Sequence, residues 1–236
     1  MLDRILEPEV MDTALEARDY DAMDHRAVNR VFVDDLFSAL SNSRRGSAVG
    51  ELARLFVLDL GAGTAQIPIE LCRRAVDMRV VAVDAAAEML VVAASNVARA
   101  GLASRITLER ADAKRLPYSD GTFDAVISNS IVHHIPQPRT VLAEAIRVAA
   151  PGGLLFFRDL MRPADRATLD GLVDTYAAGA NEHQRRMFAE SLHAALTLAE
   201  IRGLVAELGF AAESVQATSD RHWTWSVWKS NAGAMS

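Results

Sequence analysis

The stretch Val57-Leu-Asp-Leu-Gly-Ala-Gly-Thr-Ala65 decides the fold. It completes a largely apolar run, Arg54–Leu60, which predicts a buried strand that ends in a glycine-rich turn. Ala65–Ala75 follows as a predicted helix, with Pro68 in the first turn, where a missing backbone N–H costs little. A strand, such a turn and a helix let ligand atoms approach the backbone closely. The stretch therefore predicts an α/β sheet with a ligand site at its first turn.

Short apolar runs alternate with longer periodic segments after this turn, which is typical of a parallel α/β sheet. Thr197-Leu-Ala-Glu200 is a capping box that opens a late helix closed by Gly209. The alternating run His222–Trp228 predicts a last strand at or near a sheet edge, antiparallel after the turn at Ser219-Asp220. The other predicted elements are the strands Met78–Asp84, Arg105–Glu109, Phe123–Asn129 and Leu154–Phe157 and the helices Ala87–Ala100 and Pro138–Ala149.

Two regions lie outside this pattern. Before the segment Ser41–Gly50, the charged amphipathic stretches Glu9–Arg18 and Asp24–Leu40 predict helices. We therefore expect an N-terminal helical segment, residues 1–50, that covers the ligand pocket, followed by a main domain, residues 51–236. Between the fifth strand and the capping-box helix, residues 159–196 hold two polar helical segments that the sheet does not need. They predict a helical cap inserted after the fifth strand.

Composition excludes several classes of protein. Of 236 residues, 25 are Lys or Arg and 31 are Asp or Glu, so the net charge is −6. Half of the residues are hydrophobic, which excludes a disordered chain, and the acidic balance argues against broad nucleic-acid binding. Cys72, the single cysteine, excludes an internal disulfide. With no apolar stretch long enough for a membrane span and no signal-peptide core, we expect a cytoplasmic protein.

Two carboxylates mark the predicted ligand site. Asp59 is placed to support the glycine turn or to receive an ammonium group. Asp84 ends the second strand, the usual place for a carboxylate that binds ribose hydroxyls. A dinucleotide fold normally has a third glycine where this chain has Gln66, which weakens the nicotinamide interpretation. The pattern predicts a nucleoside cofactor, with a tight turn that binds no ligand as the alternative.

Further motifs, Ala111-Asp-Ala113, Phe123–Asn129 and Ala150-Pro-Gly-Gly153, complete a family pattern. Over about Phe56 to Phe210 the chain resembles the class I methyltransferases that use S-adenosylmethionine, nearest the branch that includes the ubiquinone and menaquinone C-methyltransferases. The resemblance implies S-adenosyl-L-methionine as cofactor. With the elements above, it implies an α/β, Rossmann-like, doubly wound sheet of seven mostly parallel strands with an antiparallel last strand.

The resemblance also assigns cofactor contacts. Asp59, Gly61 and Gly63 would meet the methionine part, and Asp84 would hold the ribose. Asp112 and Ala113 would contact the adenine, whose ring Met89 would cover, and the backbone carbonyl of Asn129 would receive the amino group. Ala65 stands where the family often has a further glycine.

Three side chains have two interpretations each. The segment Ala17-Arg-Asp-Tyr-Asp-Ala-Met-Asp24 is similar to one that folds over the cofactor pocket in that branch. Tyr20 would then reach the donor carboxylate, or it is only packed in a helix-to-helix turn. His133 and His134 follow the fourth strand and are candidate general bases because their pKa suits neutral pH. A structural or positioning role is the alternative, and adjacent side chains on a short turn are expected to point apart.

The predicted function is methyl transfer from S-adenosylmethionine to a small-molecule acceptor by in-line displacement. A non-catalytic module that binds S-adenosylmethionine is the first alternative, and an NAD-dependent oxidoreductase is the second. We predict no metal site. The acceptor, the methylated atom and the oligomeric state stay open at this point.

Overall fold

The computed structural model describes residues 2–8, 10, 12–23, 25–43, 54–75 and 77–231. The chain divides into two compact units. The sheet unit contains residues 10–129, 143–157 and 226–236, and the cap unit contains residues 1–9, 130–142 and 158–225. The expected boundary at Gly50 and most of the segment Ser41–Gly50 lie outside the described residues.

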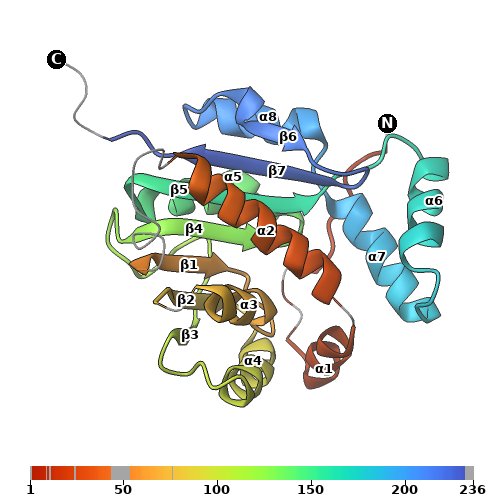
Figure 1. Ribbon diagram of the computed structural model, residues 1–236. Helices are drawn as coiled ribbons and strands as arrows, with labels where there is room; N and C mark the ends of the chain where they lie inside the picture. The colour runs from red at the N-terminus through yellow and green to blue at the C-terminus, as the bar shows by residue number, and fades with distance from the viewer. Residues whose placement is uncertain are drawn as a thin grey trace. The chain divides into compact units, whose positions relative to one another are not determined.

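Seven strands form one sheet in the order β3-β2-β1-β4-β5-β7-β6 (Figure 1). Strand β1 pairs in parallel with β2 and β4, while β6 and β7 pair antiparallel. The arrow of β7 points opposite to those of β4 and β5 (Figure 1). The predicted fold class is confirmed. The strands are β1 Phe56–Leu60, β2 Arg79–Asp84, β3 Ile106–Arg110, β4 Phe123–Asn129, β5 Ala149–Leu160, β6 Val215–Ala217 and β7 His222–Trp228.

Strand β5 begins at Ala149, five residues before the predicted start at Leu154. The reason is long-range pairing across Pro-Gly-Gly: the N–H of Gly152 donates to the carbonyl of Lys229, and the N–H of Lys229 donates to the carbonyl of Gly153, both at 2.8 Å. Gly152 adopts a left-handed φ of 71°, which lets the strand continue past proline as it does at a bulge. The prediction that this motif lies outside the strand was wrong.

The helices beside the parallel strands are α1 Ala14–Ala22, α2 Arg26–Ser43, α3 Gln66–Arg74, α4 Ala87–Arg99 and α5 Pro138–Val148. Helix α1 begins well after the predicted Glu9, because Thr13 and Glu16 form a capping box. Helix α2 lies across the strands (Figure 1), and the ring of Phe32 packs edge-on against that of Phe156, with centroids 5.2 Å apart. Burial of these aromatic rings fixes α2 on the sheet.

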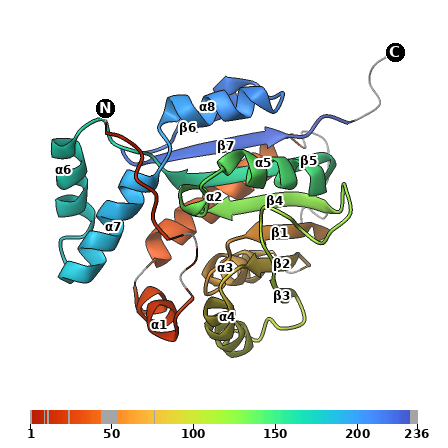
Figure 2. The ribbon, with the colours of Figure 1, turned by 180° about the vertical axis from the view of Figure 1, so that it is seen from behind.

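The cap unit holds η2 Val132–His134, α6 Arg166–Tyr176, α7 Glu182–Ala194, α8 Leu198–Glu207 and η3 Ala212–Ser214. Helices α6 and α7 lie side by side in both views (Figures 1 and 2) and pack through Leu169, Leu172 and Leu192. The predicted helical cap and the capping box of Thr197 and Glu200 are confirmed. Within the described ranges, no helix has both the length and the apolar character that crossing a membrane requires.

Candidate functional site

The turn after β1 is wound tightly at the end of the sheet unit's central strand. Gly61, Gly63 and Ala65 have left-handed φ angles of 68°, 53° and 63°. The N–H groups of Gly61 and Ala62 both donate to the carbonyl of Val83, at 2.9 and 3.0 Å, so the turn is bound to the end of β2. Glycine adopts this conformation freely, whereas a side chain there costs about 1–2 kcal/mol.

Asp84 braces this turn from β2. Its Oδ2 accepts a hydrogen bond from the N–H of Gly63 at 2.8 Å, and its Oδ1 accepts one from the N–H of Ala86 at 2.9 Å. Burial raises the pKa of this carboxyl above its ordinary value, although both N–H donors act to lower it. Each oxygen keeps a further lone pair, so the predicted contact with ribose hydroxyls is compatible with this bracing role.

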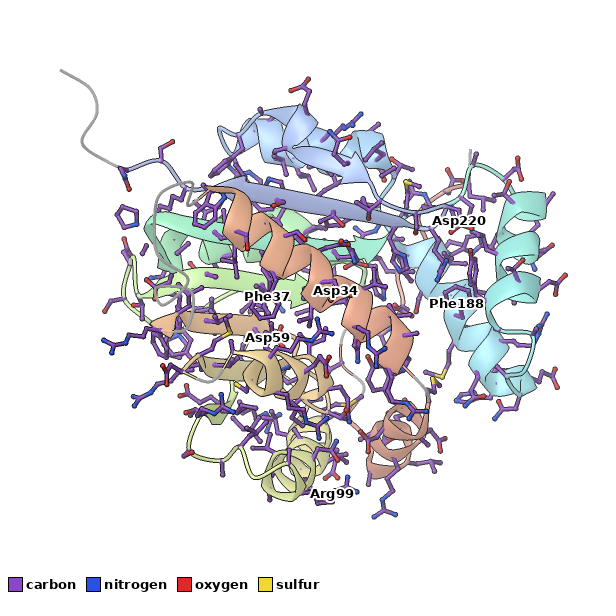
Figure 3. The ribbon with its side chains drawn as sticks, in the orientation of Figure 1. Asp34, Phe37, Asp59, Arg99, Phe188 and Asp220 are labelled. Carbon is purple, nitrogen blue, oxygen red and sulfur yellow. The ribbon has the colours of Figure 1, made fainter. Side chains whose placement is uncertain are left out.

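Asp59 is a buried carboxyl group of the sheet unit. Its side chain lies on β1 (Figure 3) and is 2% exposed. Among the residues that the structure describes, its Oδ2 has no hydrogen-bond partner. Burial and the charge of Asp84 raise the pKa of Asp59 well above its ordinary value. A buried carboxylate is costly unless it is paired, so this oxygen fits a ligand that brings a positive charge, such as an ammonium group.

A small cavity of about 30 Å³ opens beside Asp59. Of the predicted binding residues, it is lined by Tyr20, Asp59, Gly61 and Asn129. His25, Asn29, Thr64 and Gln66 also line it, and the sequence prediction did not include them as binding residues. Gly63, Asp84, Met89, Asp112 and Ala113 are not among its lining residues.

Tyr20 reaches the glycine turn from α1. A Cβ atom on Gly63 would lie 3.6 Å from Cε1 of Tyr20, and the rings of Tyr20 and His25 have centroids 4.8 Å apart. Tyr20 lies within α1, Ala14–Ala22, and not in a helix-to-helix turn. Burial and the charges of Asp84 and Asp59 raise the pKa of Tyr20 to about 12, so its hydroxyl stays protonated and can donate.

Asp21, the next residue, attaches α1 to the glycine turn. Its Oδ1 accepts hydrogen bonds from Nε2 of Gln66 at 3.0 Å and from Nδ2 of Asn96 at 2.8 Å. The same Nδ2 of Asn96 also donates to the carbonyl of Thr64 at 3.0 Å. The sequence prediction missed Asp21, although its place beside Tyr20 in the quoted segment was the available signal.

The residues predicted to contact adenine lie along neighbouring strand ends. The N–H of Ala111 donates to the carbonyl of Asp84 at 3.1 Å, which places the loop of Asp112 beside β2. Oδ1 of Asp112 accepts from the N–H of Lys114 at 2.9 Å, and Ala113 is buried. Met89 packs with Ala17 and Ala86 and does not line the cavity. The adenine contacts of Met89, Asp112 and Ala113 stay predictions.

A second polar cluster lies in the cap unit around η2. Nδ1 of His133 is 2.5 Å from Oδ1 of Asp159, whose Oδ2 accepts from the N–H groups of Val132 and His133 at 2.5 and 3.2 Å. The ring centroids of His133 and His134 are 4.2 Å apart. The expectation that these adjacent rings point apart was wrong, because both are directed toward one carboxylate.

That carboxylate belongs to Glu7. Its Oε1 lies 3.3 Å from Nε2 of His133 and 3.0 Å from Nδ1 of His134, and its Oε2 accepts from Oγ of Ser191 at 3.1 Å. Sequence reasoning did not find Glu7, because 125 positions separate it from Val132, where η2 begins, and no motif surrounds it.

Charges in this cluster are strongly coupled. Burial lowers the pKa of His133, but Asp159 and Glu7 more than compensate, so its pKa stays above the ordinary value. Burial and the neighbouring His133 lower the pKa of His134 to about 3. Burial raises the pKa of Glu7, against the effect of His133. At neutral pH His134 is therefore neutral, whereas the carboxylates of Asp159 and Glu7 favour the protonated form of His133.

The ligand atoms of Glu7, His133 and His134 lie within 4.8 Å of one another, a donor set that can hold a transition-metal ion. Arg4 opposes this use. Its Nη2 donates to the carbonyls of His133 and Ile135 at 3.1 and 3.0 Å, and its positive charge acts on the His133 ring. The guanidinium of Arg4 repels a dication, and the arrangement suits proton transfer as well as cation binding.

The comparisons with known proteins agree on a family. A family model described as "Methyltransferase domain" matches residues 58–157. The malonyl-[acyl-carrier protein] O-methyltransferase of Geobacter sulfurreducens is 31% identical over 207 residues, 84% of this chain and 68% of that protein. The ubiquinone/menaquinone biosynthesis C-methyltransferase UbiE of the same organism is 31% identical over 111 residues, 47% of this chain and 43% of that protein.

Solved structures share the fold. A SAM dependent methyltransferase from Aquifex aeolicus superposes with a TM-score of 0.52 at 18% identity, covering 74% of this chain and 81% of that chain. Several curated relatives are longer proteins: the chain spans about half their length, 56% and 43% in two cases.

Proposed function

Because this chain belongs to the class I S-adenosylmethionine-dependent methyltransferases, near the ubiquinone/menaquinone C-methyltransferase branch, we propose that it methylates a small-molecule acceptor that loses a proton. S-adenosylmethionine is the cofactor of this family. The observation that best supports an enzyme is the buried contact between Nδ1 of His133 and Oδ1 of Asp159, 2.5 Å apart, because a carboxylate beside an imidazole suits proton transfer.

Asp59 is the proposed contact for the ammonium group of the cofactor, since its buried oxygen has no partner in the described chain. Asp84 is proposed to accept from the ribose hydroxyls while it braces Gly63, and Tyr20 to donate to the cofactor's carboxylate. The carbonyl of Asn129 remains the proposed acceptor for the amino group.

The bound cofactor supplies a methyl group already activated on a sulfonium, so the protein mainly has to position the acceptor for in-line displacement. Positioning of this kind is worth about 7–11 kcal/mol of the barrier. A general base adds about 10²–10⁴-fold when the acceptor must lose a proton.

His134 is the proposed base. It is neutral at pH 7, and its side chain is 19% exposed, against 4% for His133. Asp159 holds Nδ1 of His133 and favours its protonated form, so the proposed role of His133 is to hold the cluster together. A cytoplasmic location and a small-molecule acceptor, with no nucleic-acid substrate, are part of this proposal.

Methyl-labelled S-adenosylmethionine tests the proposal directly. Purified protein is incubated with the labelled donor and a protein-free cell extract, which is then separated into organic and aqueous phases and followed by mass spectrometry. We expect label in a small molecule, and His134→Gln should lower its transfer while donor affinity, measured by calorimetry, holds. Donor binding without transfer in any fraction would contradict the enzyme and favour the binding module. Tight binding of NADH but not of S-adenosylhomocysteine would contradict the cofactor assignment.

A further inference from the structure

Three donor atoms meet in the cap unit without hydrogen bonds between them. Oε1 of Glu7 lies 3.3 Å from Nε2 of His133 and 3.0 Å from Nδ1 of His134. Despite these distances, Oε1 of Glu7 and Nδ1 of His134 are buried atoms that have no hydrogen-bond partner among the residues that the structure describes. Buried polar atoms without a partner are costly, so the cluster favours a ligand that binds these atoms together.

Each imidazole is oriented by an acceptor on its other nitrogen. Nδ1 of His133 is 2.5 Å from Oδ1 of Asp159, and His134 is hydrogen-bonded to the backbone of Pro8. Proline has no backbone N–H, so the ring of His134 donates to the Pro8 carbonyl. Because Nδ1 of His134 has no partner in the described chain, the donor is Nε2, and Nδ1 carries the lone pair. Metal-binding histidines are commonly oriented in this way, by a carboxylate or a backbone carbonyl.

Glu7 is also held on the side that faces away from the rings. Its Oε2 accepts a hydrogen bond from Oγ of Ser191 on α7 at 3.1 Å. The N-terminal segment that carries Glu7 is bound to the same helix, because the N–H of Ile5 donates to the carbonyl of His193 at 3.3 Å. The protein thus binds one oxygen of this carboxylate and leaves Oε1 for a ligand.

Two imidazole nitrogens and one carboxylate oxygen form a donor set that suits zinc. Zinc binds nitrogen and oxygen at about 2.0–2.2 Å, which places the donor atoms of a tetrahedral site about 3.3 Å apart. The distances of 3.3 and 3.0 Å from Glu7 fit this value. All three donor atoms lie within 4.8 Å of one another, and a rotation of the partly exposed ring of His134 brings its nitrogen closer to that of His133. Three protein ligands leave the fourth position for water.

Arg4 works against a dication, but its charge is offset. Its guanidinium donates to the backbone carbonyls of Ala194, His133 and Ile135. Apart from the imidazoles, the principal charged groups that act here include two more carboxylates than guanidinium groups. These groups are Arg4, Arg162, Glu7, Asp159, Glu190 and Glu200. A dication balances this excess of negative charge, so Arg4 weakens cation binding without excluding it.

We propose that Glu7, His133 and His134 form a binding site for one zinc ion, which ties the N-terminal segment to η2. All three ligands belong to the cap unit, and the inference does not rest on the proposed function. The ion takes the place of the proton that Asp159 and Glu7 favour on His133, since a ligating imidazole is neutral. A bound ion also occupies Nδ1 of His134, so zinc binding and proton transfer through this nitrogen exclude each other.

Zinc binding is measured on untagged, chelator-treated full-length protein, without cofactor or acceptor. Isothermal calorimetry with ZnCl2 should show one ion per chain, and thermal unfolding should show a higher Tm in the presence of ZnCl2. MgCl2 should cause neither effect, because magnesium prefers oxygen ligands and keeps its own water molecules.

Variants distinguish the ligands from their supports. Glu7→Gln and His134→Gln each remove one ligand and should raise the Kd for zinc by more than about 100-fold. Ser191→Ala keeps all three ligands but frees Oε2 of Glu7, and should raise the Kd by about 10-fold, the smaller effect of an outer partner. His183→Gln removes a histidine of α7 that lies outside the site and should leave the Kd unchanged.

Circular dichroism without zinc reports whether each variant is folded, and either of the two ligand variants is sufficient if the other does not fold. Absence of zinc binding to the unsubstituted protein would overturn the inference. So would a Kd that neither Glu7→Gln nor His134→Gln changes. None of these measurements involves methyl transfer, so failure of the zinc site and failure of the proposed function are separate results.

Discussion

The substitution Asp59→Asn should change protein stability and cofactor affinity in opposite directions. In the folded chain the Asp59 carboxyl is buried, carries a raised pKa, and has an oxygen for which the described residues supply no partner. A buried unsatisfied polar group costs about 1–3 kcal/mol, and ionising it costs more. The amide keeps the shape and carries no charge. We therefore expect the free energy of unfolding without ligand to rise by about 1 kcal/mol or more, which is about 2–4 °C in Tm for each kcal/mol.

Asp59→Asn should weaken cofactor binding, although it raises the stability of the free protein. Loss of a charge-assisted hydrogen bond to an ammonium group costs about 1.5–3 kcal/mol, so the Kd for S-adenosylmethionine should rise by about 10- to 100-fold. Isothermal calorimetry measures the Kd, and thermal unfolding followed by circular dichroism measures the stability. Glu88→Gln, in the first turn of α4, removes the same charge from the sheet unit; it should leave the Kd unchanged and should lower the free energy of unfolding by less than about 1 kcal/mol.

The pH dependence of the free energy of unfolding tests whether the raised pKa of Asp59 is the cause of the stability difference. A carboxyl whose folded pKa is raised binds its proton more tightly in the folded state. Its contribution to stability is therefore present at low pH and is lost as the pH rises above the ordinary carboxyl pKa of about 4. Asp59→Asn should remove this loss, so the variant gains most at neutral pH and least in acid. If Asp59→Asn destabilises the protein and leaves the Kd unchanged, Asp59 is a structural brace and the ammonium contact is refuted.

Three further variants test the geometry. Asp84→Ala should raise the Kd of S-adenosylmethionine by about 10- to 100-fold by calorimetry, and an unchanged Kd would remove Asp84 from the site. Gly63→Ala should destabilise the fold by about 1–2 kcal/mol through its φ of 53° alone, because the added Cβ makes only an ordinary contact with Tyr20. Asp159→Asn should cost about 3–5 kcal/mol in denaturant unfolding at pH 6, since it leaves His133 buried beside a neutral partner. Because the pKa of His133 is raised in the folded chain, the stability that its contact with Asp159 contributes is present at low pH and is lost as the pH rises through that pKa. The free-energy cost of Asp159→Asn should therefore decrease over the same pH range.

Local sequence rules located most of the sheet unit and the two cap helices. The glycine turn, the strand ends at Asp84 and Asn129, and the capping box at Thr197 each follow from interactions within a few residues. One error occurred where a residue far along the chain determines where a strand begins. Strand β5 starts early because Lys229 pairs with its Pro-Gly-Gly segment. Strand β6, with three residues, is too short to show a pattern of its own.

The sequence by itself determined the fold class, because backbone conformation and hydrophobic periodicity act over short distances along the chain. The cofactor followed from the resemblance to a family that the motifs carry, and not from periodicity. Only the tertiary structure decided which side chains pair in the cap unit. Glu7, His133 and Asp159 come from three separate segments, and their pKa values depend on burial and on charges 2.5–3.3 Å away. Such coupling depends on distance in space, which periodicity and spacing do not encode.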